Sequence, residues 1–531
     1  MSTDGSGSGD QPLTRAQLRA MREAAVHEET VRGAAAGEAG AASSVADRPS
    51  APVSTDAGAG LPQPARGETG AGEAPTTAAR RFGIVLAVVL GILLVVGGGL
   101  SAASLLQGPR VAAVEVDPKQ AIESSGSRVI LTANQPLAAI DESQVTVEPA
   151  VPFTIDAAGR SVGIRFTVPL DDSTRYSVRV AGAQRAGGGP SSDLATAFTT
   201  PDSQAFLLQR SDKDDTIFRT DLTGEKGVAV FSAPRIDDFR ATATRLVVAV
   251  EEDDRSRLLV MNRDGSGQRE LKLPGKGYVA TLQVSERGDL VGYTYSDAEL
   301  TETSGRASLL VTQPLSGKGD PRIVQVAGKE VGIDDWQFVP DTSSLVFLDF
   351  DGALSVEDPT GDAGVQPMGT AAQLLGVTRG TFTAIVERAT GEIVELNLTD
   401  GSEQPMPSTD PDYGPPADVV PYPGGALQLV VQRDEVGMPI GQKVITVAPD
   451  GAAKPILELG DDDAVLQTCV SPSGQYAAVT VTPDLTDNPY DELLLPLPKK
   501  VHTELIDLRA GKPLTTLSGF DLSWCHVGPQ A

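Results

Sequence analysis

The C-terminal part of the chain, residues 202–531, repeats a pattern of short strands and turns. Each unit consists of a short strand, a turn, a more apolar strand, a loop and a third strand that ends in a turn; clear examples begin at Asp237, Asp334 and Thr468. A period of about 40 to 45 residues with loop insertions is typical of the four-stranded blade of a β-propeller. The aligned inner-strand positions of successive units are Asp238, Thr281, Asp335, Leu375, Asp418, Gln467 and Ser523.

The first and last strands of residues 202–531 are expected to form one blade together. Residues 520–527 predict an inner strand with no strand after it, whereas residues 204–209, 216–221 and 228–232 predict three strands with no inner strand before them. Joined, they form one blade, so the sequence predicts seven blades. Because several repeats are degenerate, six and eight blades remain alternatives.

Residues 110–201 predict a second all-β domain. Six or seven short alternating strands in about ninety residues are typical of a β-sandwich. Gly159, Ser161 and Gly163 match the pattern of a hydrolase nucleophile elbow, but that motif requires a strand-to-helix turn, so we expect a hairpin instead. The predicted strands cover residues 111–116, 128–132, 144–148, 161–168, 175–181 and 195–199.

Both β-regions resemble known families. VEVDP at residues 114–118, FTVPLDDSTRYSVRVAG at 166–182 and AFTTP at 197–201 resemble bacterial Ig-like domains of surface-layer and envelope proteins, which implies a spacer or adhesion module. WQFVPDTSSLVF at residues 336–347 and CVSPSGQYAAV at 469–479 resemble repeats of TolB-type and WD40-like β-propellers. The expected fold class is all-β, with an Ig-like β-sandwich at 110–201 and a seven-bladed β-propeller at 202–531.

The N-terminal region predicts a cytoplasmic tail and a membrane anchor. Residues 1–81 are rich in Ala, Gly, Ser and Pro, which predicts disorder. Residues 82–109 contain no charge, and we expect a transmembrane helix at 82–107. A signal peptide is the alternative, but the region before the apolar run is far too long for one. Arg80 and Arg81 adjoin the N-terminal end of this helix, so the positive-inside rule places the tail in the cytoplasm and the later domains outside it.

Net charge limits the partners. The chain has 43 basic and 71 acidic residues, and residues 202–531 contain 27 of the basic and 51 of the acidic ones. An acidic surface repels phosphate backbones, which argues against nucleic-acid binding. We therefore expect protein partners of the cell envelope with a basic or neutral surface, and contact with the membrane through one helix.

Two sets of side chains are candidate sites. Cys469 and Cys525 fall at equivalent positions of neighbouring predicted blades, so outside the cytoplasm they could form a disulfide; the alternative is two buried thiols. Asp238, Asp335 and Asp418 share one aligned position and could converge at a mouth of the channel to bind a cation or a basic partner. The alternative is that Asp is simply favourable before a strand.

The sequence predicts no catalytic residue and no cofactor. The favoured function is a single-pass membrane protein whose propeller is a non-enzymatic protein-binding or scaffolding module of the bacterial cell envelope. The alternative is a propeller hydrolase, lyase or glycan-binding protein acting on cell-wall polysaccharide, which would need aromatic rings beside paired carboxylates. The only two tryptophans are Trp336 and Trp524, and both are expected in inner strands.

Overall fold

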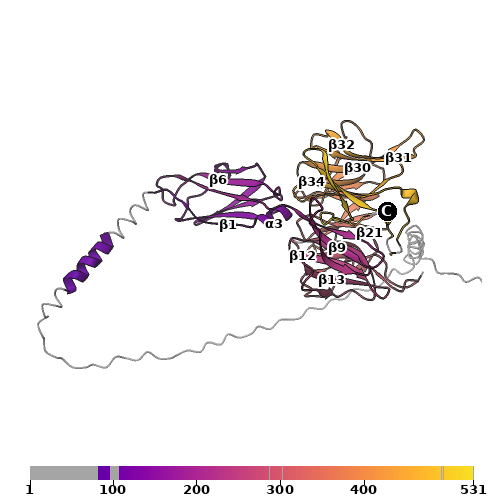
Figure 1. The fold of residues 1–531 in the computed structure, drawn as a ribbon, viewed down its shortest axis with the longest axis horizontal. Helices are drawn as coiled ribbons and strands as arrows, with labels where there is room; N and C mark the ends of the chain where they lie inside the picture. Colours follow the sequence, from indigo (N-terminus) through magenta and orange to yellow (C-terminus); the bar gives the residue numbers. More distant parts are fainter. Residues whose placement is uncertain are drawn as a thin grey trace, which may run out of the picture. The chain divides into compact units, whose positions relative to one another are not determined.

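The computed structural model describes residues 82–95, 107–285, 287–301, 303–491, 493 and 496–529. The chain divides into two compact units, Met1–Gln107 and Gly108–Ala531. The second unit is built almost entirely of antiparallel β-strands (Figure 1). The predicted disordered tail, residues 1–81, lies outside the described residues.

The first unit contains one described helix, residues 82–95. Its large apolar side chains are all exposed, from Leu86 at 46% to Leu94 at 77%. Within the described part of the chain, no helix has both the length and the apolar character needed to cross a membrane. The rest of the predicted 82–107 helix falls largely on residues 96–106, which are not described.

The second unit begins with two sheets that share one core. Alternate side chains of both sheets point into this core, and Val129, Ile164 and Tyr176 are fully buried there. Each of the six predicted strands coincides with an observed one. One sheet has the order β1 (Val111–Val116), β2 (Arg128–Ala133), β5 (Ser161–Phe166) and β4 (Phe153–Ala158); the other has β3 (Val145–Glu148), β6 (Arg175–Ala183) and β7 (Ser192–Thr199).

Three elements of this domain were not predicted: the strand β4, the helix α3 and the short 3-10 helix η2 (Glu142–Gln144). Strand β4 forms a hairpin with β5, so the turn at Gly159 and Arg160 joins two strands and not a strand and a helix. The short helix α3 (Pro118–Glu123) is capped by Asp117, whose carboxylate accepts hydrogen bonds from the backbone N–H groups of Lys119 and Gln120.

Residues 204–518 form successive antiparallel sheets. The first has three strands in the order β10 (Val228–Ala233), β9 (Asp215–Asp221) and β8 (Gln204–Gln209). Six four-stranded sheets follow among the described residues. Their strands are β11 (Ile236–Ala241), β12 (Arg245–Glu251), β13 (Ser256–Asn262) and β14 (Arg269–Leu271); β15 (Gly277–Ser285), β16 (Leu290–Asp297), β17 (Leu309–Pro314) and β18 (Arg322–Ile323); β21 (Ile333–Phe338), β22 (Leu345–Asp349), β23 (Ala353–Glu357) and β24 (Gln366–Thr370); β25 (Gln373–Val377), β26 (Thr383–Glu387), β27 (Ile393–Asn397) and β28 (Glu403–Pro405); β29 (Pro416–Tyr422), β30 (Gly425–Arg433), β31 (Pro439–Val447) and β32 (Ala453–Leu459); and β33 (Ala464–Val470), β34 (Tyr476–Thr482), β35 (His502–Asp507) and β36 (Lys512–Ser518).

Each sheet packs against the next through an apolar cluster. The cluster around Phe239 joins β8 and β9 to β11 and β12, and further clusters join each later sheet to its successor. The last cluster, around Leu505, joins β33–β36 back to β8. The series of shared cores therefore returns to its starting sheet, which is a propeller-like arrangement.

The first strand of every four-stranded sheet has a β-bulge near the residue aligned from the sequence. The register of the β11–β12 pair shifts between Ile236 and Asp238, and that of the β33–β34 pair between Val465 and Gln467. The corresponding shifts lie beside Thr281, Asp335, Leu375 and Asp418. A bulge bends the strand and changes the direction of its side chains, and here it recurs at the same position of each sheet.

Candidate functional site: the C-terminal latch and the channel

The end of the chain pairs with β8 and completes the three-stranded sheet. Backbone N–H groups of Leu208 and Phe520 donate to each other's carbonyls at 2.9 and 3.0 Å. Ser523 N donates to the Phe206 carbonyl at 2.9 Å, and Phe206 N donates to the Ser523 hydroxyl at 3.0 Å. We call residues 520–527 the C-terminal latch.

The latch differs from the straight inner strand predicted for residues 520–527. Only Phe520 forms a ladder bridge, and Asp521 has a left-handed backbone with φ of 53°. Cys525 N then donates to the Leu522 carbonyl, which closes a turn. The prediction of a regular strand was wrong here because the backbone turns at Asp521, and the side chain of Asp521 enters a buried ion pair.

That ion pair is centred on Arg240 of β11. Its guanidinium lies 2.9 Å from a carboxylate oxygen of Asp521 and 2.8 Å from one of Asp238, and the Arg240 and Asp521 side chains are only 3% and 2% exposed. Burial raises the pKa of Asp238; Arg240 opposes this shift and the negative charge of Asp521 adds to it. One buried cation thus joins the chain end to the first four-stranded sheet.

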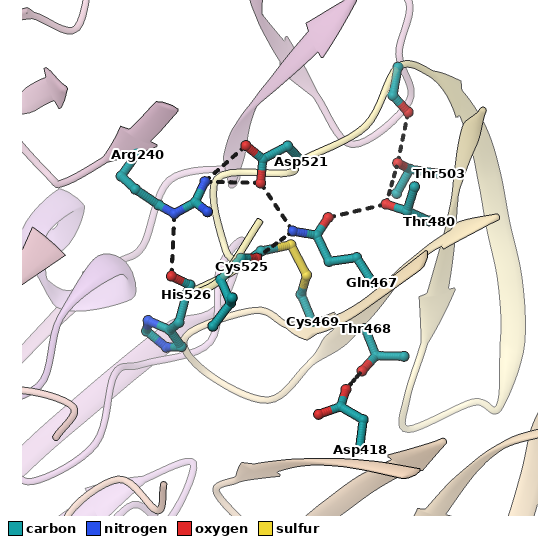
Figure 2. The surroundings of a disulfide bond; sticks show 12 residues. Arg240, Asp418, Gln467, Thr468, Cys469, Thr480, Thr503, Asp521, Cys525 and His526 are labelled. Atoms are coloured by element: carbon teal, nitrogen blue, oxygen red, sulfur yellow. Dashed lines mark hydrogen bonds and ion pairs between the residues drawn. A yellow bond between two sulfur atoms is a disulfide. The ribbon is translucent and has the colours of Figure 1, made fainter. Parts of the chain in front are cut away.

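Gln467 of β33 holds the latch from the opposite side. Its amide nitrogen donates to Asp521 Oδ1 at 3.0 Å and to the Val527 carbonyl at 2.6 Å. The Arg240 Nε donates to the His526 carbonyl at 3.3 Å. Figure 2 shows these two side chains on either side of the latch. Gln467 accepts a hydrogen bond from Thr480, which orients its amide.

The predicted disulfide between Cys469 and Cys525 is present (Figure 2). The two Cα atoms lie 5.0 Å apart, and both residues are buried. Cys469 is in β33 as expected, whereas Cys525 lies in the turn of the latch. Trp524 beside it stacks on Tyr476 with 6.1 Å between ring centroids. The latch is therefore attached to β33 covalently as well as by Gln467.

His526 is the one titratable side chain of the latch, residues 520–527, that forms no ion pair. Desolvation of the imidazole by the surrounding protein lowers the pKa of His526. The positive charge of Arg379 lowers it further, while the negative charge of Asp341 opposes the shift. Its side chain keeps an exposed surface. Arg379 itself forms an ion pair with Asp341 at 2.6 Å. The neutral imidazole is thus the form favoured in the folded protein.

Two cavities meet at Trp524, Cys525 and His526. One has a volume of about 310 Å³ and the other about 350 Å³. Polar side chains in the first include Asp335, Gln337, Gln373, Asp418 and Gln467. The second is lined by Arg240, Arg263, Arg287 and Arg379 together with the end of α3. Both cavities thus mix charges: Arg379 lines both of them, and the carboxylates of Glu123 and Asp341 also line the second.

The structure does not bring the three candidate aspartates together as one cation site. Asp335 and Asp418 line the same cavity, but Asp238 is bound to Arg240 and lies outside that lining. Thr468 donates a hydrogen bond to Asp418, and burial raises the pKa of Asp418. Among the described residues there is no group of three or more His, Cys, Asp or Glu side chains placed to hold a metal. Equivalent positions in the repeat do not ensure convergence, because the neighbouring residues differ: Arg240 pairs with Asp238, whereas Thr468 donates to Asp418.

Sequence reasoning missed Arg240 and gave Gln467 no role. The spacing of Asp238 and Arg240, two apart on one strand, puts both side chains on the same face and could have signalled an ion pair. Asp521 could not have been assigned to it, since it lies 281 residues from Arg240.

No family model matches the chain, and no curated protein matches it. Similar solved structures include TolB from Acinetobacter baumannii, with 11% identity, a TM-score of 0.34, and coverage of 71% of this chain and 82% of that one. Another is the β-propeller domain of Cps50 (Swd1) from Myceliophteria thermophila, with 11% identity, a TM-score of 0.34, and coverage of 54% and 89%. An uncharacterized protein from Listeria monocytogenes, lmo1340, has 12% identity, a TM-score of 0.38, and coverage of 59% and 91%. The chain has a propeller-like all-β fold.

Proposed function

We propose that this chain is a single-pass membrane protein of the bacterial cell envelope, with residues 82–107 as its anchor and residues 1–81 in the cytoplasm. Residues 110–201 serve as an Ig-like spacer. Residues 202–531 form a seven-bladed propeller, closed by the latch, that acts outside the cytoplasm as a non-enzymatic protein-binding or scaffolding module.

The observation that carries this proposal is the disulfide-linked latch. Disulfides persist in oxidising compartments and are rare in the cytoplasm, so the Cys469–Cys525 bond favours an extracytoplasmic propeller. Three latch residues, Trp524, Cys525 and His526, line both cavities.

The exposed helix at 82–95 supports the anchor. Eleven large apolar side chains of this helix are exposed, which is unfavourable in water and favourable in lipid. Arg80 and Arg81 precede it in the sequence. A membrane would cover this surface and fix the orientation with the tail inside.

The glycan-binding alternative has less support. Trp336 is 1% exposed and packs edge-on against Phe338, while Trp524 is 9% exposed and stacks on Tyr476. Sugar recognition of the kind considered uses an accessible aromatic face. The Trp336 ring is thus buried in the protein core, and Trp524, although it lines both cavities, has one ring face covered by Tyr476.

Protease protection in intact bacterial cells tests the proposed topology. The full chain with an N-terminal tag is expressed, and protease added outside should remove the C-terminal domains while the tag survives until the cells are lysed. Replacement of Arg80 and Arg81 by Glu is the matched control and should reduce the fraction with this orientation. Protection of the C-terminal domains in wild-type cells would refute the proposal.

Crosslinking in the same cells tests the binding role and should recover protein partners through the propeller. Recovery of no partner from any face of the propeller would refute that role.

A further inference from the structure

The hairpin between β30 and β31 has an unusual apolar tip. Val436, Met438 and Ile440 are 83%, 61% and 51% exposed. Outside the 82–95 helix, the other large exposed apolar residues are scattered singly over the described chain, at Val114, Val228, Leu300, Leu485, Tyr490 and Leu514. Clustered exposure of this kind marks contact surfaces, whereas single exposed residues need no explanation.

The tip projects beyond its own sheet. Strand β29 pairs with β30 only as far as Val430, and β32 pairs with β31 only as far as Gln442. The residues between these points pair only with each other across the hairpin. The hairpin is visible beside the label of β31 in Figure 1. Its end is therefore accessible from both faces.

The turn at the tip is held in one conformation by its own hydrogen bonds. The Asp434 carboxylate accepts from the N–H groups of Val436 and Met438, each at 2.9 Å. Gly437 has a φ of 86°, a value that favours glycine, and its carbonyl accepts from the Arg433 guanidinium at 3.0 Å. A surface ordered before binding loses less entropy when a partner docks.

The charge around the tip indicates what it would contact. Asp434 and Glu435 adjoin the apolar side chains and are exposed, and together they outnumber the one exposed cation of the turn, Arg433. The whole region 202–531 has 51 acidic and 27 basic residues. This surface is repelled by anionic lipid and by nucleic acid, and it is complementary to a groove with basic side chains at its edge.

We propose that residues 434–440, the hairpin tip, are a docking element that inserts Val436, Met438 and Ile440 into an apolar groove of a protein partner whose rim carries Lys or Arg. Asp434 orders the turn and faces the basic rim, the three apolar side chains enter the groove, and Glu435 lies at the edge of the contact, where a probe can replace it. This inference rests on the proposed protein-binding function and assigns it a surface.

The test uses full-length protein in intact cells, with a photo-crosslinking amino acid at Glu435 and a second chain with the same probe at Leu514. A variant with Val436→Thr, Met438→Gln and Ile440→Thr is compared with a matched control in which three scattered exposed residues are changed, Val228→Thr, Leu300→Gln and Leu514→Gln. The control is made in the Glu435-probe chain only. Tryptophan fluorescence melting, which reports Trp336 and Trp524, should be the same for all.

We expect a crosslinked protein at Glu435 that falls at least about tenfold in the tip variant and is unchanged in the control; a tenfold change is a 1.4 kcal/mol difference. On isolated membranes, raising NaCl from about 0.05 to about 0.5 M should reduce the yield of the crosslinked protein, because salt screens the contacts with the basic rim. Equal crosslinking in the tip variant and wild type overturns the inference. So does crosslinking at Glu435 only to lipid or to a second copy of this chain. If the Leu514 probe captures a partner but Glu435 does not, the binding function stands and this surface fails; capture at neither site counts against both.

Discussion

Arg240 is the residue on which the closure of the propeller-like domain most depends. Replacing it by Gln would leave Asp238 and Asp521 buried without a cation, and breaking a buried pair in this way costs about 3 to 5 kcal/mol. We expect the Arg240→Gln chain to lose about that much free energy of unfolding. Urea denaturation followed by tryptophan fluorescence measures it on the propeller-like domain alone, since both tryptophans lie there.

The matched control is Arg257, which also joins two carboxylates but at the surface. It contacts Glu252 and Glu270, and its side chain is 35% exposed. Arg257→Gln should cost less than about 1 kcal/mol because solvent screens an exposed pair. Equal losses in the two variants would contradict a special role for Arg240.

Asp237 should make the stability depend on pH. Burial and the negative charge of Glu251 raise its pKa from 3.8 to about 7, while Arg210 opposes the shift. The folded state therefore binds a proton that the unfolded state releases, so the free energy of unfolding falls as pH rises from about 4 to about 7. Asp237→Asn should flatten this part of the profile, with the largest gain in stability at the high-pH end.

Urea titrations at several pH values between about 5 and about 8 measure the slope. Asp264→Asn is the control. Hydrogen bonds from Ser266 lower the pKa of Asp264, so this residue changes the stability only at pH values more acidic than the range measured. An unchanged slope in Asp237→Asn would show that other groups, such as Asp238, cause the pH dependence.

Among the elements, the disulfide determines how firmly the latch stays in place. It closes a loop with a sequence separation of 56 residues, for which the chain-entropy model gives about 4 kcal/mol as an upper value. Replacing both Cys469 and Cys525 by Ala should lower the free energy of unfolding by up to that amount.

Adding reductant to the wild-type protein should lower its free energy of unfolding by a similar amount. The double Ala variant is the control, because it has no disulfide for the reductant to break. Thermal melting with and without reductant measures both. If reductant does not shift the wild-type melting temperature, the latch is held by its noncovalent contacts, namely the pairing with β8 and the contacts of Arg240 and Gln467.

The strands were predictable where apolar residues alternate, and the exceptions have local causes. Residues of β5 and β6 follow the alternation, and their predicted ranges, 161–168 and 175–181, end within two residues of the observed strands. Strand β4 was missed because its second half, Asp156 to Ala158, is exposed and gives no apolar pattern. The bend at Asp521 was missed because its cause is an arginine in another sheet.

At the scale of the whole molecule, the repeat period predicted a propeller-like domain, but the contacts of that domain with the two-sheet domain could not be predicted. Arg263 forms an ion pair with Glu123 at 2.5 Å, and the Tyr476 hydroxyl donates to Asp172 at 3.0 Å. Their partners lie 140 and 304 residues away in sequence. No periodic pattern in the sequence relates residues so far apart.

The excess of acidic residues in the propeller-like domain predicts a dependence on salt. Its 51 acidic and 27 basic residues repel one another more in the folded than in the unfolded chain. Raising NaCl from about 0.01 to about 0.15 M shortens the screening length from about 30 to about 8 Å, so the melting temperature should rise by about 2 °C. A variant with Asp461→Asn and Asp462→Asn, two exposed carboxylates, should show a smaller rise.

The opposite sign is also physically possible, which makes the measurement decisive. Exposed ion pairs such as Lys272 with Asp320, at 2.6 Å, are weakened by salt and would lower the melting temperature if they dominated. Each such pair contributes little, whereas unpaired carboxylates act together over the whole surface. A fall in melting temperature between the same two salt concentrations would therefore contradict self-repulsion as the main electrostatic effect, and with it the expectation that a partner of this domain is basic.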